Sequence, residues 1–125
     1  MIYGVGTDIV AIARMADLYR RHGERALEKL LAPAERQACR EATLPARFLA
    51  KRFAAKEALG KALGSGVRAP VLLPAIAVGH SAAGQPFFEY AEALAAHLQR
   101  LGLSAHLSLS DEAELALAFV VVEKK

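Results

Sequence analysis

RFAAKEALGKALGSG, residues 52–66, carries the longest helical pattern of the chain together with features that weaken a helix. Arg52 and Lys56 bring like charges four residues apart, which destabilises a helix by roughly a few tenths of a kcal/mol. Gly60 lies inside the pattern, where glycine is roughly 1 kcal/mol less favourable than alanine. Glu57 lies among these residues and not on an open polar stripe. A helix that keeps such residues is expected to use them for binding.

The segments on either side of this helix predict a mixed structure. Helical periodicity runs over 46–63, after Pro45, and ends at Gly64, Ser65 and Gly66. Because helices and strands do not alternate regularly, we expect an α+β fold, with an antiparallel sheet and a long packed helix, in one domain spanning 1–125. The other predicted helices are 11–21, 25–31, a third from Pro33, and 91–101; the predicted strands are 2–10, 75–80, 86–90, 106–110 and 115–123, the last four forming hairpins across SAAGQ and DEAE.

The composition indicates a globular chain in a reducing compartment. Hydrophobic residues make up 54% of the chain, and the formal net charge of +3 suits an acidic partner. Cys39 is the only cysteine, so no intrachain disulfide is expected. No apolar run approaches the roughly 18 residues of a membrane span. The first residues, MIYGVGTDIV, predict a strand and not a signal peptide, so we expect a cytoplasmic protein without a membrane partner.

GVGTDIV, residues 4–10, contains the first candidate for chemistry. Side chains alternate along a strand, so Gly4, Gly6, Asp8 and Val10 share one face, and the glycines are expected to leave a hollow before the carboxylate. Asp8 could instead end the strand or cap the next helix, but it lies within an apolar run. A buried carboxylate needs a partner, a hydrogen-bond network or a metal ion.

Glu57 is the second candidate carboxylate. Taken alone, it would form an i,i+4 ion pair with Lys61. However, Arg52, Lys56 and Lys61 surround it with positive charge, and a bound anion would relieve the repulsion between them. Gly60 would let a bulky ligand approach the helix backbone. Because Mg²⁺ is typically held by one or two carboxylates plus phosphate oxygens, Asp8 and Glu57 predict a magnesium site that also binds phosphates.

Three motifs, GVGTDIVAIARM, FLAKRFAAKEALGKALGSG and HLSLSDEAELALAFVVVE, together resemble the holo-[acyl-carrier-protein] synthase family, the small bacterial 4′-phosphopantetheinyl transferases. The resemblance covers nearly the whole chain. It implies transfer of phosphopantetheine from coenzyme A to a serine of apo acyl carrier protein, for fatty acid biosynthesis, with release of 3′,5′-ADP. It also implies that Asp8 and Glu57 bind Mg²⁺, and that the α+β fold forms a homotrimer with active sites between subunits.

Further residues are expected to act in this reaction. Arg52, Lys56 and Lys61 are the candidates for phosphate contacts, with Lys56 nearest the chemistry. The base that takes the serine proton is either a water on the metal or a carboxylate such as Glu57. Many relatives carry a histidine where this chain has Asp111, so a histidine base is excluded there, while His106 is interpreted as structural. Weaker candidates for coenzyme A binding are Gly64, Ser65 and Gly66, which could equally terminate the helix, and Pro86, which could simply form a turn.

A basic stripe predicts where the acidic carrier protein docks. Arg14, Leu18, Arg21 and Arg25 recur at helical spacing, provided that the helix continues past Gly23. The stripe could be an ordinary solvated face. An arginine-rich stripe around one apolar residue nevertheless suits an acidic partner with a small hydrophobic anchor.

Three other functions fit parts of the sequence. One is a phosphopantetheinyl transferase for a different carrier domain, as in secondary metabolism. Another is a small basic nucleic-acid-binding module, but aromatic residues make up only 6% of the chain and none interrupts the basic stripe. The third is a trimer without catalysis, which the presence of both Asp8 and Glu57 argues against.

Overall fold

The computed structural model describes residues 1–125 and confirms the α+β class. The predicted helices and strands are all present, with boundaries close to the expected ones. β4 begins at Leu103, earlier than the predicted start at 106, because Gly102 ends the preceding helix and Leu103 pairs at once with Lys124. The elements are β1 (Ile2–Ala11), α1 (Ile12–His22), α2 (Glu24–Leu30), α3 (Pro33–Glu41), α4 (Pro45–Leu63), the 3₁₀ turn η1 (Leu73–Ala75), β2 (Ile76–His80), β3 (Pro86–Tyr90), α5 (Glu92–Leu101), β4 (Leu103–Asp111) and β5 (Leu115–Lys124).

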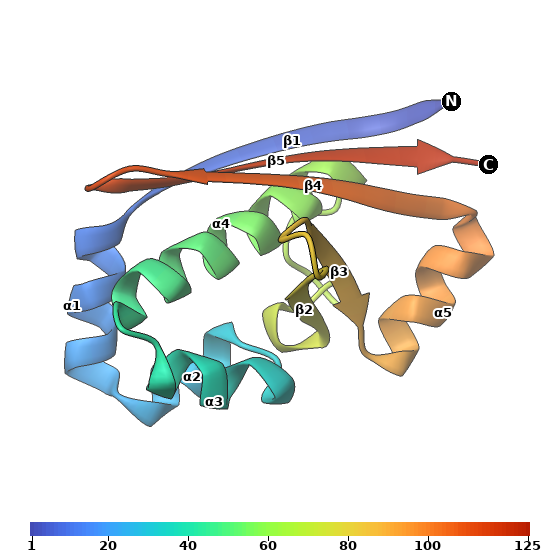
Figure 1. Ribbon diagram of the computed structural model, residues 1–125. Helices are drawn as coiled ribbons and strands as arrows, with labels where there is room; N and C mark the ends of the chain where they lie inside the picture. Colours follow the sequence, from blue (N-terminus) through green and yellow to red (C-terminus); the bar gives the residue numbers. More distant parts are fainter.

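An antiparallel sheet in the order β1-β5-β4 forms one layer, and α4 lies along its inner face (Figure 1). The last strand of the chain is therefore central. Its inward residues are small or β-branched and fully buried against α4: Ala116, Ala118, Val120 and Val122. The register aligns Asp8 of β1 with Ala118 and Leu109, so Asp8 lies at one edge of the sheet and Leu109 at the other.

Glycines set the distance between β1 and α4. A Cβ atom on Gly4 would lie 2.0 Å from the carbonyl oxygen of Ala62, and one on Gly6 would lie 2.1 Å from that of Ala58. The expected hollow in front of Asp8 is therefore wrong, because the helix backbone fills it. The glycines instead allow α4 to pack directly on the strand.

Gly60 also serves packing rather than ligand approach. The chain folds back after α4, and the amide of Gly66 donates to the carbonyl of Gly60 at 3.0 Å. A Cβ atom on Gly60 would lie 2.9 Å from the carbonyl carbon of Gly66. The prediction that Gly60 admits a ligand is wrong for this structure, since the chain itself occupies that space.

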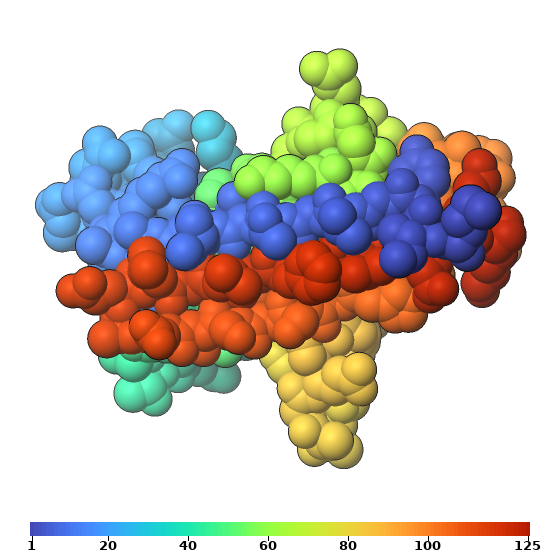
Figure 2. Space-filling model, turned by 90° about the horizontal axis from the view of Figure 1, so that it is seen from above, coloured from blue at the N-terminus to red at the C-terminus, as the bar shows by residue number.

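The outer face of the sheet is uncovered and apolar. Figure 2 shows β1, β5 and β4 side by side with nothing packed over them. The β2–β3 hairpin projects beyond the β4 edge, and the segment after α4 projects beyond the β1 edge (Figure 2). The large hydrophobic residues exposed on this face are Val5, Ile9, Leu115, Leu117 and Phe119.

No helix of the structure is long and apolar enough to cross a membrane.

Candidate active site

The antiparallel packing of β1 on α4 brings the two predicted carboxylates together. Gly4 lies against Ala62 and Gly6 against Ala58, so each step of two strand residues corresponds to one helical turn. Asp8 continues this face of β1 along α4, close enough for its negative charge to act on Glu57. Its carboxylate is largely covered, with 16% of the side chain exposed.

The charges around this pair are coupled. Burial, followed by the negative charge of Asp8, raises the pKa of Glu57 above its usual value, while Lys61 and Arg14 oppose that rise. The i,i+4 spacing of Glu57 and Lys61 suggested an ion pair between them, but Lys61 does not form it. Its Nζ instead donates to Oδ1 of Asp8 at 3.1 Å and to the carbonyl of Thr7 at 2.9 Å. Lys61 thus links α4 to β1 and remains accessible, with 54% of its side chain exposed.

The donor set of this pair fits Mg²⁺. Because the negative charge of Asp8 disfavours the ionised form of Glu57, a cation between the two carboxylates would be stabilising. The structure contains no cluster of three or more His, Cys, Asp or Glu side chains that could hold a metal ion. A site with only two protein carboxylates suits Mg²⁺, which usually keeps several waters and takes its other ligands from phosphates. Asp8 and Glu57 are the residues that would hold it.

Arg52 and Lys56 turn away from this pair, toward an internal anion. Glu35 of α3 is buried, and its Oε1 accepts a hydrogen bond from Lys56 Nζ at 2.6 Å while its Oε2 lies 3.2 Å from Arg52 Nη1. The backbone amides of Ala32 and Val78 also donate to this carboxylate, at 2.8 and 2.9 Å. The anion that relieves the like charges on the helix is therefore part of the protein.

The prediction that Lys56 contacts phosphate near the chemistry is contradicted by this arrangement. Its side chain is fully buried, and its three protons are donated to Glu35, to the Leu30 carbonyl at 2.8 Å and to the Leu73 carbonyl at 3.1 Å. Burial lowers the pKa of Lys56 to about 8, against the opposing effect of Glu35. With no free donor and no solvent access, Lys56 joins α2, α3, α4 and η1 as a structural residue.

Arg52 is held in place but faces a cationic hollow. Its guanidinium lies over the Phe48 ring, 4.4 Å from the centroid, and Nη1 donates to the carbonyl of Val78 as well as to Glu35. The hollow measures about 260 Å³. It lies between the first half of α4, the end of β2 and the end of β4, and its lining includes Arg47, Lys51, Arg52 and His80.

Asp111 lies at the rim of this region and is a poor base. Arg47 Nη1 donates to its Oδ2 at 2.6 Å, and Lys51 Nζ lies 3.6 Å from Oδ1. The hydrogen bond from Arg47 lowers the pKa of Asp111 below its usual value. His106, expected to be structural, is exposed on the outer face of the sheet, where Nε2 lies 2.5 Å from Glu123 Oε1.

The weaker coenzyme A candidates lie in two separate places, the turn after α4 and the start of β3. Gly64 adopts a left-handed conformation at the C-cap of α4, and its amide donates to the Lys61 carbonyl. Gly66 likewise uses its amide within the same turn, and Ser65 donates to the Gly66 carbonyl at 2.8 Å. Helix termination therefore accounts for all three. Pro86 begins β3 beside β4, whereas Asp8 is on β1 at the opposite edge of the sheet, so a single chain does not bring them together.

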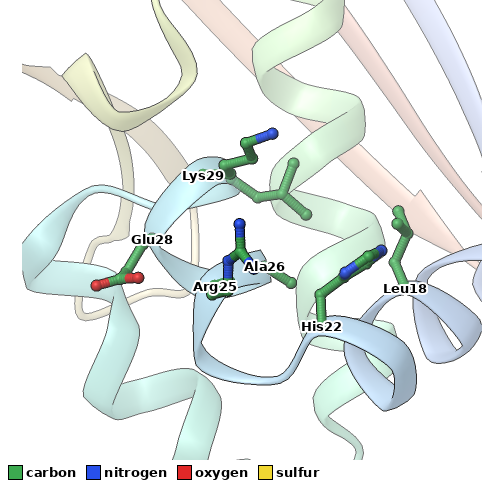
Figure 3. Close-up of a pocket in the computed structure, with 7 residues that line it drawn as sticks. Leu18, His22, Arg25, Ala26, Glu28 and Lys29 are labelled. Carbon is green, nitrogen blue, oxygen red and sulfur yellow. The ribbon is translucent and has the colours of Figure 1, made fainter.

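The basic stripe leads from the carboxylate pair to a second hollow. Arg14 lies over the Phe53 ring at 5.4 Å and close enough to Glu57 to affect its pKa, and Arg21 pairs with Asp17 at 3.0 Å. Gly23 ends α1 as predicted, so Arg25 belongs to α2 and the stripe does not run along one continuous helix. Leu18 and Arg25 nevertheless line one hollow of about 480 Å³ between α1 and α2, with His22 and Lys29 (Figure 3).

A comparison with known families now identifies the chain. A family model described as the 4′-phosphopantetheinyl transferase superfamily matches residues 4–120, which include both carboxylates, Glu35 and the basic stripe. The chain belongs to this superfamily. The family resemblance expected from the three motifs is confirmed, and with it the expectation of a transferase.

Relatives of this phosphopantetheinyl transferase match it over its whole length. It is 57% identical over 123 residues to a holo-[acyl-carrier-protein] synthase of Dechloromonas aromatica, covering 98% of both chains. The crystal structure of holo-[acyl-carrier-protein] synthase from Neisseria meningitidis superposes with a TM-score of 0.95 at 46% identity, covering 99% of this chain and 100% of that one. A synthase from Bacillus anthracis in complex with CoA (3′,5′-ADP) superposes with a TM-score of 0.83 at 31% identity, covering 100% and 99%.

Glu35 is the residue of this transferase that sequence reasoning missed. It occupies the third position of a helix that starts at Pro33, where a glutamate commonly caps the helix by accepting from the N-cap amide. The role of Glu35 in capping the helix could therefore have been predicted from the neighbouring residues. Nothing in the local pattern indicated that the same carboxylate also binds Arg52 and Lys56, 17 and 21 residues further along the chain.

Proposed function

We propose that this chain transfers 4′-phosphopantetheine from coenzyme A to a serine of an apo acyl carrier protein, in a Mg²⁺-dependent reaction that releases 3′,5′-ADP. The observation that carries the proposal is the carboxylate pair Asp8 and Glu57, contributed by β1 and α4, with Lys61 beside it. Membership of the 4′-phosphopantetheinyl transferase superfamily and the named synthases among its relatives support this choice of substrates.

At phosphorus the reaction makes one bond and breaks one, and one proton is transferred. The serine oxygen bonds to the phosphorus that carries pantetheine, the bond from that phosphorus to 3′,5′-ADP breaks, and the serine proton leaves to a base. Mg²⁺ bound by Asp8 and Glu57 would offset the negative charge that develops on the pyrophosphate oxygens. Lys61 is the exposed cation nearest the pair and would contact the same oxygens. Asp111 is a poor proton acceptor, because the hydrogen bond from Arg47 lowers its pKa, so the base is either a water on the metal or a carboxylate such as Glu57.

The basic stripe supplies the docking surface for the acidic carrier protein. Arg14 lies beside the carboxylate pair, whereas Leu18 and Arg25 line the hollow between α1 and α2. A carrier that anchors an apolar residue in this hollow and pairs its acidic residues with Arg14, Arg21 and Arg25 would extend toward Asp8 and Glu57. The stripe thus connects partner recognition with the site of transfer.

The proposed assembly is a homotrimer with active sites between subunits. A contiguous apolar sheet face of this kind marks an interaction surface in soluble proteins. Pro86 and the cationic hollow that Arg52 lines lie toward the β4 side, away from Asp8, so a neighbouring copy would bring the two halves of a coenzyme A site together. Sedimentation equilibrium should give three times the monomer mass, and a monomer at working concentration contradicts this assembly.

We further propose that the protein works in the cytoplasm, where its single buried cysteine needs no oxidising environment.

The deciding experiment is intact-mass spectrometry of an apo acyl carrier protein incubated with this chain, coenzyme A and Mg²⁺, with EDTA as the control. A metal-dependent gain equal to one phosphopantetheine is expected. No gain, with coenzyme A binding intact, would indicate that another carrier domain is the substrate. No gain and no coenzyme A binding would contradict the proposed reaction, and DNA binding with a steep salt dependence would favour the nucleic-acid alternative.

A further inference from the structure

Glu35 is a buried carboxylate that the proposed reaction does not use. Its side chain is 2% exposed, yet it accepts hydrogen bonds from two backbone amides and two cationic side chains. Breaking such a network is costly, because a buried charge without partners is strongly unfavourable. A structural role explains the amides and Lys56, all of which lie in the interior. Arg52 is different, because it also reaches a surface hollow.

Arg52 is fixed on several sides and open on another. Nη1 is engaged by Glu35 and by the Val78 carbonyl, and the guanidinium plane lies over Phe48. Both of these hydrogen bonds use the same nitrogen. The side chain also lines the cationic hollow, where positive charge from Arg52 and Lys51 contributes, after burial, to lowering the pKa of His80. A guanidinium held in one orientation is well suited to a phosphate, because little freedom is lost on binding.

We propose that Glu35 is a positioning residue for coenzyme A binding: it holds Arg52 in the orientation in which Arg52 contacts a phosphate of coenzyme A in the hollow. This inference rests on the proposed function, in which the hollow that Arg52 lines is part of the coenzyme A site. Glu35 itself does not touch the substrate. Its effect passes through the Oε2–Nη1 contact and the Val78 amide, which fixes the same carboxylate oxygen.

The opposite effect has to be considered, since Glu35 also neutralises Arg52. If neutralisation dominated, removing the negative charge would strengthen anion binding. Lys56, which lies 2.6 Å from the other carboxylate oxygen, already balances the charge of Glu35. Arg52 is thus left with its positive charge uncompensated within the group of three, and orientation becomes the main effect. Positioning therefore predicts weaker binding on substitution, whereas neutralisation predicts tighter binding.

Two substitutions separate these effects. Glu35→Gln removes the charge and forces its NH₂ group to face either the Arg52 and Val78 donors or the Lys56 and Ala32 donors. Glu35→Asp keeps the charge but is one methylene too short to reach Arg52. We expect both to raise the dissociation constant for coenzyme A by about tenfold in calorimetric titration, as for the loss of one charge-assisted contact. Glu41→Gln, on the exposed end of the same helix, is the matched control and should bind as the unaltered chain does.

Lys56→Met distinguishes positioning from general destabilisation. It leaves the contact between Glu35 and Arg52 in place but lets Glu35 offset part of the charge of Arg52. At a temperature where the variant is folded, its dissociation constant should therefore rise by no more than about threefold, less than in Glu35→Asp. In an Arg52→Gln background, Glu35→Asp should cause no further loss. Equal losses in Lys56→Met and Glu35→Asp, additive losses in the double variant, or tighter binding by Glu35→Gln would each overturn the proposal. Failure of the unaltered chain to bind coenzyme A overturns the proposed function itself.

Discussion

Lys56 and Lys61 lie on the same helix, five residues apart, in very different surroundings. Lys56 faces α2, α3 and η1, is fully buried, and donates to one carboxylate and two carbonyls. Lys61 faces β1, keeps more than half of its side chain in solvent, and donates to Asp8 and to the Thr7 carbonyl. The buried side of α4, with Glu35, Arg52 and Lys56, is thus satisfied internally. On the open side, the side chains of Asp8, Glu57 and Lys61 remain accessible to a metal ion or a substrate.

A cationic side chain near a carboxylate is therefore not by itself a binding residue. The number of free donors and the access of solvent decide whether a lysine holds the fold together or meets a substrate. Arg52 lies between the two cases, because it is tied to Glu35 and still borders a hollow.

The largest effect should come from the carboxylates on the open side. Asp8→Asn and Glu57→Gln should each reduce transfer by about a thousandfold, because several kcal/mol of charge stabilisation depend on the metal they hold. Circular dichroism should show an unchanged fold. Glu41→Gln, which alters an exposed carboxylate at the end of α3, is the control. Near-normal transfer in either carboxylate variant would remove the metal assignment.

The two lysines should fail in opposite ways. Lys56→Met should lower the free energy of unfolding by about 3–5 kcal/mol, since it leaves a buried carboxylate and two carbonyls short of a partner. Lys61→Met should change it by about 1 kcal/mol or less, as is usual for an exposed pair, but should reduce transfer by at least about tenfold. Urea unfolding and single-turnover kinetics provide the two measurements. If both variants lost stability but not transfer activity, Lys61 would have no role in the reaction.

Gly6→Ala tests the contact that brings the open side together. The new Cβ atom would overlap the carbonyl oxygen of Ala58, so β1 and α4 must separate. We expect a loss of about 1–3 kcal/mol in the free energy of unfolding, as for other overpacked sites, together with weaker transfer because Asp8 moves away from Glu57. Gly102→Ala at the end of α5, where the backbone is left-handed and a Cβ atom would meet only an ordinary contact, should cost stability and leave transfer unchanged. An unchanged free energy of unfolding in Gly6→Ala would contradict the close packing of β1 on α4 and support the hollow predicted from the sequence.

Cys39 reports whether water reaches the buried side of α4, and the expected change in stability is the smallest of these predictions. Burial raises the pKa of the Cys39 thiol to about 11, from an ordinary value of 9.0. Unfolding therefore releases a proton between about pH 9 and 11, and the associated stability, fully present below pH 9, is lost as the pH rises through this window. At pH 10 the unaltered chain should have lost about 1 kcal/mol relative to Cys39→Ala. Iodoacetamide should label the native thiol far more slowly than the urea-unfolded one; equal rates would mean that water reaches this side.

Much of the architecture was predictable because its signals are local. Gly23, Pro33, Pro45, Gly64 and Gly102 each mark a helix boundary by backbone preference alone, and alternation marks the strands. The proximity of Asp8 and Glu57 was predicted from two carboxylates that accompany several cations, and the negative charge of Asp8 does act on Glu57. The motif resemblance then indicated the family.

The sequence by itself thus determined the elements, the family and the two carboxylates, because these depend on neighbours along the chain. Only the tertiary structure decided which of the three cations around Glu57 are free. Glu35 reaches Arg52, Lys56 and the Val78 amide across separations of 17 to 43 residues, and no local pattern encodes that convergence. The same holds for Gly4, Gly6 and Gly60, whose open space is filled by backbone from elsewhere in the chain. Burial is a property of the packed molecule, and it is burial that separates a structural charge from a chemical one.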